Sequence, residues 1–447
     1  MPGERVGIVG ARGIDNYGGY ERILADLVPR LVQKGYRVRC SCEQPERGGR
    51  VADYKGATLD YFPLKAPTNY TLRKAFELLY DSYFILRYSQ VCDIIYVLGI
   101  YGGLSLLLPR LLGREVVVNT DGLEWRRAKY NVVEQSLIVL YFGISLNLAS
   151  KIIVDNEQLK RFIGKKHHAK IFYVPYGVSE QESKLWDESK LSNYLGENGK
   201  IKKDKYWLLI SRLEPENNIH VIVDGFVQAK SKYPLVIVGD FTSDHYQNRV
   251  YRQAFNGNSA NVVFLGAIYD ADALWMLRQH CRAYIHGHSV GGTNPSLLEA
   301  MISRNLIICH DNPFNRELCS SYAHYFADSA DLSNLVISTE ESVAEPFELC
   351  SGVYERAVGA YSWDHVAASY DEVFGDGNHV VGTHSKTEMP VTDRIGKRDA
   401  ELGLFKTGIK FGRILLYVMI TLSTESYVVL MHIASQIAPT CGIWWPL

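Results

Sequence analysis

The chain has 447 residues, of which 47% are hydrophobic and 22% charged, and its net charge is −1. This length exceeds one ordinary hydrophobic core, so we expect two domains. The small net charge gives no general attraction to nucleic acid, and any anionic ligand must therefore be bound locally. Eight scattered cysteines without a CxxC pair exclude a disulfide scaffold and predict reduced, mostly buried thiols in a cytoplasmic protein. No histidine pair has the spacing of a metal site, so we predict no bound metal.

Short β-branched runs alternate with helical patterns in the first half of the chain. Residues 21–35 have the apolar spacing of an amphipathic helix and end at Gly35, as expected of a helix C-cap. This alternation predicts a parallel sheet covered on both faces. The strands are expected at 5–11, 36–43, 93–99, 115–122, 151–156 and 171–177.

Residues 179–205 are polar and charged and have no strand pattern, which predicts a linker or a surface excursion. The alternation then begins again, and the sequence therefore predicts two doubly wound units. Ligands of such sheets bind outside the carboxyl ends of the strands, so the expected site is the cleft between the units. Strands of the second unit are expected at 207–213, 235–240, 262–267, 281–287 and 306–311.

A glycine-rich loop follows the first predicted strand in 7-GIVGARGIDNYGGYE-21. Its backbone is suited to approach a phosphate or a sugar, although an ordinary turn has the same composition. A dinucleotide site is disfavoured, because the spacing is G-x-x-G-x-x-G and not G-x-G-x-x-G. The second strand also ends at Glu43, about thirty residues past the glycines, where roughly 20 are expected.

A second glycine-rich turn opens 286-HGHSVGGTNPSLLEAM-301. Pro295 suits the first turn of a helix, where its missing N–H has no consequence. Strand, turn and helix N-terminus together point N–H groups and the positive end of a helix dipole at an anion. Glu299 lies in the apolar helix and needs hydrogen-bond partners, either sugar or ribose hydroxyls or a backbone amide of the same turn.

Arg212 follows a predicted strand in SRLEPENN, and a helix is expected to begin near Pro215. A guanidinium group at this place reaches a diphosphate with a planar and permanently charged fork. The alternative is a surface arginine paired with Glu214 or Glu216.

Asp121 and Glu124 follow another predicted strand in 119-NTDGLEWRRAKY-130. Carboxylates at the carboxyl end of a strand are candidates for acceptor recognition or proton handling. The basic residues Arg126, Arg127 and Lys129 after them fit a solvated helix face as well as a binding role.

Together these motifs resemble glycosyltransferase family 4. SRLEPENN, VGD, FLGAIYDADAL and PSLLEAM, in this order, are similar to its C-terminal half. GIVGARGIDNYGGYE, TDGLEWRRAKY and HSVGGTNPSLLEAM resemble a rhamnosyltransferase-type subgroup of capsule and exopolysaccharide synthesis. The resemblance spans about residues 5–375 and implies the α/β GT-B fold, in which two Rossmann-like domains face each other across a cleft. The expected limits are 1–180 for the acceptor domain and 206–375 for the nucleotide-sugar domain.

The resemblance assigns donor-binding roles residue by residue. Arg212 matches the diphosphate-binding arginine, and Glu299 matches the glutamate that hydrogen-bonds the ribose. Gly18 and Gly19 match the N-terminal loop near the donor phosphates.

The chain departs from the family pattern at three places. The first glutamate of the E-x7-E pair is replaced by Gly291, and the lysine after the arginine is replaced by Asn217. The histidine near the acceptor is replaced by Asp121. Backbone amides of the glycine turn are expected to take over part of the donor binding, so the predicted donor contacts include Gly291, Gly292, Thr293 and Asn294.

The resemblance implies a retaining hexosyltransferase without cofactor or metal, with Arg212, Glu299 and Asp121 as catalytic residues and Glu124 on the acceptor side. The expected donor is a nucleoside-diphosphate sugar, with dTDP-L-rhamnose as the best candidate. The expected acceptor is a saccharide or a lipid-linked saccharide of cell-surface polysaccharide synthesis. Three alternatives stay open: a GT-B nucleotide-sugar epimerase, a phosphorylase, and a non-catalytic sugar-nucleotide-binding protein.

The end of the chain differs from the rest. Residues 376–413 predict a polar linker, and 414–447 form an apolar tail whose only formal charge is Glu425. A membrane span needs about 20 apolar residues, and an acidic residue at its centre costs about 2–3 kcal/mol. The tail is therefore predicted either to contact the inner face of the cell membrane or to form a helix that packs on the enzyme or dimerises. Lys406, Lys410 and Arg413 precede it and suit a cytoplasmic side.

Overall fold

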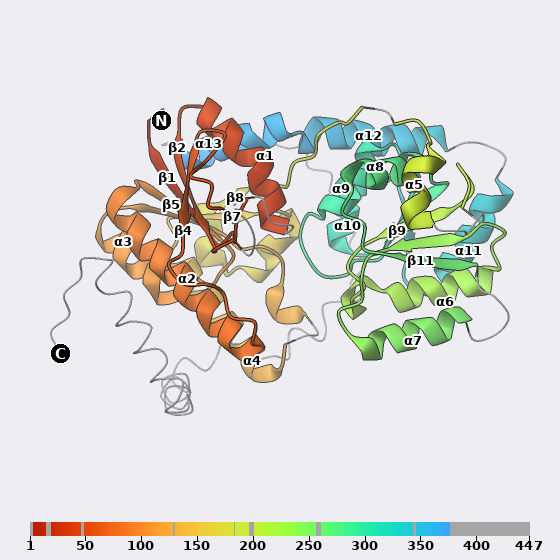
Figure 1. Cartoon of the computed structure of the whole chain (residues 1–447), viewed down its shortest axis with the longest axis horizontal. Helices are drawn as coiled ribbons and strands as arrows, with labels where there is room; N and C mark the ends of the chain where they lie inside the picture. Colours follow the sequence, from red (N-terminus) through yellow and green to blue (C-terminus); the bar gives the residue numbers. More distant parts are fainter. Residues whose placement is uncertain are drawn as a thin grey trace. The chain divides into compact units, whose positions relative to one another are not determined.

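The computed structural model describes residues 3–14, 19–45, 49–127, 130–182, 184–195, 201–255, 261–342 and 346–375 (Figure 1). These ranges contain two sheets within one compact unit, Met1–Asp376. The predicted linker 376–413 and the apolar tail 414–447 lie outside them, so their roles stay predictions. Among the helices of the described ranges, none is both long and apolar enough to cross a bilayer.

The first sheet has eight strands in the order β3-β4-β2-β1-β5-β6-β7-β8. The six predicted strands are confirmed, and each lies parallel to its neighbours. The short antiparallel pair of β3 and β4 was not predicted, because only Ala57 and Leu59 of it are buried and the apolar pattern is too short. The strands are β1 (Arg5–Val9), β2 (Arg37–Cys42), β3 (Asp53–Tyr54), β4 (Ala57–Tyr61), β5 (Ile94–Leu98), β6 (Glu115–Asn119), β7 (Lys151–Val154) and β8 (Ile171–Tyr173).

Helices cover both faces of this sheet, as the alternating pattern predicts. Helix α1 (Gly19–Gln33) covers one face, and α2 (Tyr70–Val91) and α4 (Val132–Leu148) cover the other (Figure 1). The buried side chains of α1 recur at helical spacing, which is the apolar stripe seen in the sequence. Shorter helices follow the strand ends: η1 (Gly103–Leu106), α3 (Leu107–Leu111), η2 (Glu124–Arg126), η3 (Glu157–Phe162) and η4 (Lys165–Lys170).

The second sheet has six parallel strands in the order β11-β10-β9-β12-β13-β14. The five predicted strands are confirmed, whereas the three-residue edge strand β14 was not predicted. The strands are β9 (Trp207–Ile210), β10 (Leu235–Val238), β11 (Val262–Gly266), β12 (Ala283–His286), β13 (Ile307–His310) and β14 (His324–Phe326).

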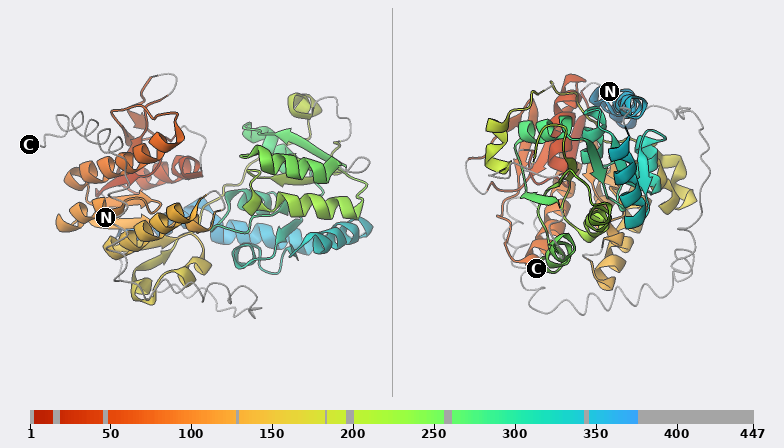
Figure 2. Two further views of the ribbon diagram at one scale, coloured as in Figure 1. Left: turned by 90° about the horizontal axis from the view of Figure 1, so that it is seen from below. Right: turned by 90° about the vertical axis from the view of Figure 1, so that its right-hand side faces the viewer.

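Helices also lie on both faces of the second sheet, with α6 and α7 on one side and α8 and α9 on the other (Figure 1). Figure 2 gives these layers from two further directions. The helices are α6 (Ile219–Ala229), α7 (Asp244–Phe255), α8 (Ala271–Gln279), α9 (Pro295–Ile302), α10 (Pro313–Cys319), α11 (Ser329–Glu341) and α12 (Phe347–Tyr361).

Two local predictions are corrected by the structure. The segment 179–205 is not merely a linker, because it contains helix α5 (Glu188–Leu195) with Leu191 buried. The helix expected near Pro215 begins later: Pro215–Asn217 forms a 3-10 turn, and α6 starts at Ile219. Asn218 separates the two with a left-handed backbone (φ 54°), a conformation that asparagine adopts more readily than most residues.

The last described helix, α13 (Trp363–Phe374), returns to the first sheet. Tyr370 OH lies 2.7 Å from Tyr96 OH of β5, and the Phe374 ring packs edge-on against Tyr36. The chain therefore passes between the two sheets twice. The passages are bonded to each other, since Val178 N–H donates to Tyr361 O at 2.7 Å. The domain limits 1–180 and 206–375 stay a prediction. Helix α13 falls within 206–375 but packs against the first sheet.

Candidate functional site

The loop after β6 and the turn after β12 meet at the carboxyl ends of the two sheets. A Cβ atom at Gly122 would lie 2.9 Å from Gly291 Cα, so the two backbones are in direct contact. Next to this contact, Asp155 at the end of β7 accepts a hydrogen bond from Thr293 N–H at 3.0 Å. Residues of both halves therefore come together where open parallel sheets bind their ligands.

The glycine turn has a backbone that suits glycine at position 291. Gly291 has φ 138°, a backbone conformation that L-residues with side chains rarely adopt. Because space around its Cβ direction is open, the backbone and not crowding disfavours a glutamate there. Gly292 is constrained differently, because a Cβ would lie 1.9 Å from Asp155 Oδ1.

We expect Gly292→Ala to destabilise the fold by about 1–3 kcal/mol, because the new methyl group and the Asp155 carboxyl cannot occupy the same space. Urea unfolding measures the change. Gly359→Ala is the matched control, since Gly359 lies in α12 with nothing within 4 Å of its Cβ direction. This control is expected to be neutral or slightly stabilising. Equal stability of the two variants would contradict the close packing of Gly292 on Asp155.

The Asp155 carboxyl is fully buried between the halves. Burial raises its pKa well above the usual value, and the nearby charge of Asp121 raises it further. The Thr293 hydroxyl also donates to the Asp155 carbonyl oxygen. The N–H and the hydroxyl of Thr293 thus both donate to Asp155. Thr293 joins the two halves in this structure, whereas the sequence predicts that it contacts the nucleotide-sugar.

Two arginines, one from each half, lie near His288. Arg212 follows β9 with 63% of its side chain exposed, and its nearest carboxylate oxygen is Glu214 Oε1 at 3.8 Å. Arg127 of the first half is bonded to Glu124 Oε1 at 2.6 Å. Burial lowers the pKa of His288 to about 3, and the charges of Arg212 and Arg127 contribute to this shift. The charges of both arginines therefore act on the same imidazole.

Arg127 was not among the predicted site residues, because basic residues in a row usually form a solvated face. The structure buries most of the Arg127 side chain. Burial lowers the pKa of Arg127, but the negative charges of Glu124, Asp121 and Glu214 outweigh the effect of burial and raise it. Glu214 belongs to the second half. The Asn217 side chain donates to Arg212 O at 2.7 Å and so fixes the loop.

His286 and His288 stack with ring centroids 4.4 Å apart and an interplanar angle of 8°. Burial lowers the pKa of both, so both imidazoles are neutral. Within the ranges that the structure describes, His286 Nε2, His288 Nδ1 and Ser211 Oγ are buried polar atoms without a hydrogen-bond partner. Buried polar atoms normally have partners, and these three follow or end the neighbouring strands β9 and β12, at the edge where parallel sheets bind ligands.

Glu299 of α9 is buried and ion-paired with two arginines. Its Oε2 contacts Arg278 of α8, whose side chain is 4% exposed, and its Oε1 contacts Arg22 of α1, whose side chain is 51% exposed. Arginine side chains, and not a backbone amide of the same turn, therefore satisfy this carboxylate. Arg22 comes from the first half, one turn after the glycine loop, so Glu299 also joins the halves.

The structure also places the remaining predicted residues. Gly18 lies outside the described residues, and Gly19 is the first residue of α1. The side-chain oxygen of Asn294 accepts from Ser296 N–H at 3.0 Å, so this oxygen caps α9. Asp121 has φ 53°, and Tyr176 OH approaches its Oδ1 at 3.5 Å. A left-handed aspartate at such a place is a strain typical of functional sites.

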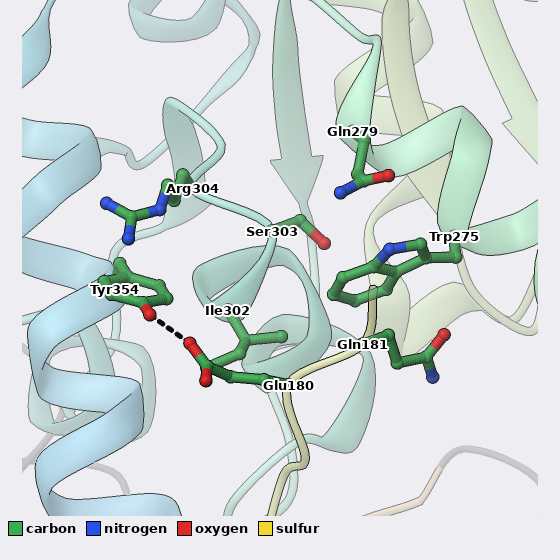
Figure 3. A pocket seen from close by; sticks show the side chains of 8 residues that line it. All are labelled: Glu180, Gln181, Trp275, Gln279, Ile302, Ser303, Arg304 and Tyr354. Carbon is green, nitrogen blue, oxygen red and sulfur yellow. Dashed lines mark hydrogen bonds between the residues drawn. The ribbon is translucent and has the colours of Figure 1, made fainter. Parts of the chain in front are cut away.

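A cavity of about 270 Å³ lies elsewhere, at the ends of α8 and α9. Figure 3 shows its lining side chains, among them Trp275, Arg304 and Tyr354, with the Tyr354 hydroxyl donating to Glu180. None of the predicted site residues lines it. Among the described residues, no three histidine, cysteine, aspartate or glutamate side chains gather as metal ligands would.

Two family models match consecutive parts of the chain. Residues 192–346 match the family described as "Glycosyl transferases group 1", and residues 4–179 match "Domain of unknown function (DUF1972)". None of the curated proteins compared with the chain matches it.

Solved structures of similar fold cover 83% of this chain. They include sucrose-phosphate synthase from Thermosynechococcus elongatus, at TM-score 0.67 and 15% identity over 98% of that chain. They also include Anabaena HepE in complex with UDP, at TM-score 0.60 and 14% identity over 98% of that chain. A glycosyltransferase from Rickettsia africae matches at TM-score 0.63 and 15% identity over 97% of its length.

The two parallel sheets, with residues of both halves meeting at their carboxyl ends, define the GT-B fold, as the sequence predicts. The protein is a glycosyltransferase, and its second half carries the group 1 domain.

Proposed function

We propose that this glycosyltransferase is a retaining enzyme of family 4, in its rhamnosyltransferase-type subgroup. It transfers L-rhamnose from dTDP-L-rhamnose to a saccharide or lipid-linked saccharide during capsule or exopolysaccharide synthesis. The observation that carries the proposal is the site around His288. The charges of two arginines act on it, and three unpartnered buried polar atoms belong to His288, His286 and Ser211 at the ends of the neighbouring strands β9 and β12, which suits the diphosphate of a nucleotide-sugar.

The proposed reaction breaks the bond between the anomeric carbon and the diphosphate oxygen. The acceptor oxygen attacks from the same face, and its proton passes to the departing diphosphate. Negative charge thus develops on the diphosphate, where Arg212 and Arg127 stabilise it more strongly in the transition state than in the bound donor. The N-terminus of α9 adds the positive end of its dipole. Asp121 orients the acceptor hydroxyl, and no enzymic nucleophile is needed.

The sugar of the donor is recognised without the first family glutamate, which is Gly291 here. The neutral imidazoles of His286 and His288 offer one donor and one acceptor each, depending on tautomer. The proposed donor follows from the subgroup resemblance, and the missing carboxylate is compatible with a sugar other than glucose.

We expect the purified enzyme to release dTDP from dTDP-L-rhamnose in the presence of acceptor, and not to release UDP from UDP-glucose. A panel of nucleotide-sugars with a coupled assay for nucleoside diphosphate measures this, and mass spectrometry of the product identifies the linkage. Release from UDP-glucose alone would refute the proposed donor. Turnover of a sugar-nucleotide without acceptor would favour an epimerase instead.

Catalysis is proposed to need no metal, because arginines and a helix N-terminus supply the positive charge. EDTA is therefore expected to leave the rate unchanged, within about twofold, whereas a metal that stabilises the leaving group contributes several kcal/mol. Loss of activity in EDTA and recovery with Mg²⁺ or Mn²⁺ would contradict this part of the proposal. The proposed location is the cytoplasm, at the inner face of the membrane that holds a lipid-linked acceptor.

A further inference from the structure

Four leucines on η1, on α3 and directly after α3 are exposed to solvent. Leu104 is 69% exposed, Leu107 47%, Leu111 74% and Leu112 48%. Leu104, Leu107 and Leu111 follow one another at helical spacing, so they form a stripe on one side of this segment. Single exposed leucines are common, whereas four in nine residues mark a surface that contacts something apolar. We call these four residues the leucine face.

Helix α4, next to this segment, is apolar around its whole circumference. Its sequence VVEQSLIVLYFGISLNL has one charged residue, yet its first residue, Val132, is 77% exposed and most of its other side chains are only partly buried. A helix without a polar side is normally enclosed by protein or lipid. The Tyr141 ring packs on Gly103, and Ser145 Oγ donates to Ile100 O at 2.8 Å. Helix α4 therefore adjoins the leucine face.

Positive charge surrounds the C-terminal end of α4. Arg110 donates to Ser150 Oγ at 2.7 Å, Lys166 to Asn147 Oδ1 at 3.0 Å, and Lys170 to Ala149 O at 2.8 Å. Burial lowers the pKa of Lys170, and the charges of Arg110 and Lys166 lower it further, so the three cations are neighbours. We call them the basic cluster.

Carboxylates neutralise only part of the positive charge in this region. The segments 94–114, 135–154 and 158–170 contain no aspartate or glutamate at all. They contain eight lysines and arginines: Arg110, Arg114, Lys151, Lys160, Arg161, Lys165, Lys166 and Lys170. Arg114, Lys151 and Lys160 are ion-paired with Asp93, Glu115 and Glu157, which lie just outside these segments. The other five, which include the basic cluster, form no ion pair with a carboxylate of the described residues. This local excess is notable in a chain whose net charge is −1.

We propose that the leucine face and the basic cluster bind the surface of an anionic lipid bilayer. Leucine side chains enter the boundary of headgroups and acyl chains, and the cations meet lipid phosphates. Charge complementarity favours this occupant. A second copy would bring an equal basic cluster, and the chain's own tail 414–447 has one carboxylate, Glu425. The proposal deepens the proposed function, because it places the enzyme where lipid-linked acceptors are found.

The same surface is connected to the acceptor side of the site. Trp125 of η2 packs on Phe142 of α4 with ring centroids 4.8 Å apart. Asp121 and Glu124 precede Trp125 in that loop. Docking of α4 and the leucine face therefore holds Asp121 and Glu124 at a fixed distance from the bilayer. This does not require that the tail 414–447 enters the membrane.

The test is sedimentation of the full chain with vesicles of phosphatidylglycerol or of phosphatidylcholine. We expect binding to phosphatidylglycerol vesicles that weakens with salt. Leu107→Asp/Leu111→Asp and Arg110→Gln/Lys166→Gln are each expected to weaken it by at least about tenfold. The matched control is Leu185→Asp/Phe347→Asp, two side chains of the second half that are 86% and 74% exposed. It is expected to bind as the wild type does.

Three results would overturn the proposal. The first is absence of wild-type binding to phosphatidylglycerol, and the second is wild-type binding by the leucine variant. The third is a change from dimer to monomer in the leucine variant with unchanged vesicle binding, which would identify a second copy as the occupant. Melting temperature and nucleoside-diphosphate release with a soluble acceptor show that each variant is folded. Vesicle binding needs no donor, so it can fail or succeed independently of the proposed reaction.

Discussion

Arg212→Ala is expected to lower kcat for sugar transfer by about 10²- to 10³-fold, the usual effect of removing one group that stabilises developing negative charge. The side chain is 63% exposed and lies 3.8 Å from Glu214, so it contributes little to folding. The melting temperature should therefore stay within a degree or two of the wild type. Steady-state kinetics at saturating donor, with calorimetry alongside, separates the two effects.

The matched control is Arg252→Ala, since Arg252 is an exposed arginine on α7 of the same half. Its kcat is expected to equal that of the wild type. If Arg212→Ala retained more than about a third of the activity, stabilisation of the leaving diphosphate by this residue would be excluded. Retention of function in cells by Arg212→Ala would favour a binding protein over an enzyme.

Glu299→Ala is expected to have the largest effect on stability, about 3–5 kcal/mol, because it leaves the guanidinium of Arg278 buried without its carboxylate. The partner on the other side behaves differently. Arg22 is 51% exposed, so Arg22→Ala should change the free energy of unfolding by less than about 1 kcal/mol. Urea unfolding of both variants measures the contrast. Comparable losses would show that Arg278 is not held by Glu299 in the way the structure indicates.

A double variant separates the structural role of Glu299 from its proposed contact with the ribose. Arg278→Met/Glu299→Leu replaces the buried pair by apolar side chains of similar size, an exchange that is often neutral in stability. We expect it to recover most of the lost stability but to keep a KM for the donor raised by at least about tenfold, the loss of one hydrogen bond to a charged group. Recovery of donor affinity together with stability would assign Glu299 a purely structural role.

The strands could be predicted because each is a short β-branched run bounded by turn residues. Trp207–Ile210 and Leu235–Val238 have every residue or nearly every residue buried, and continuous apolar runs are typical of central parallel strands. The edge strands β3 and β14 have two and three residues, too few for a periodic pattern. The 3-10 turn at Pro215 was missed because a proline at the start of a helix and a proline in a short turn have the same local sequence.

Arg212 and Asp121 follow strands and Glu299 lies in α9 after a glycine turn, and in each case a local motif is enough to place the residue. Arg212, Asp121 and Glu299 were identified this way, and their catalytic roles stay predictions. Arg22, Arg278 and Asp155 were missed, because each acts on a residue far away in the sequence and none belongs to a local motif. Asp155 stands at the end of an ordinary apolar strand, and only the fold shows that it occupies the space a side chain at Gly292 would need.

The two passages between the sheets determine how the halves can move. Val178 and Tyr361 belong to different passages and are joined by a backbone hydrogen bond, while the Trp363 ring packs where a Cβ of Gly177 would be. Two chain segments fastened side by side allow rotation about one line and resist twisting about any other. We therefore expect the halves to open and close along a single path, so that Arg22 and Glu299, or Thr293 and Asp155, separate and meet again in the same register at each turnover. A single linker would allow the halves to rotate about several axes, and these pairs would not be brought back into the same register.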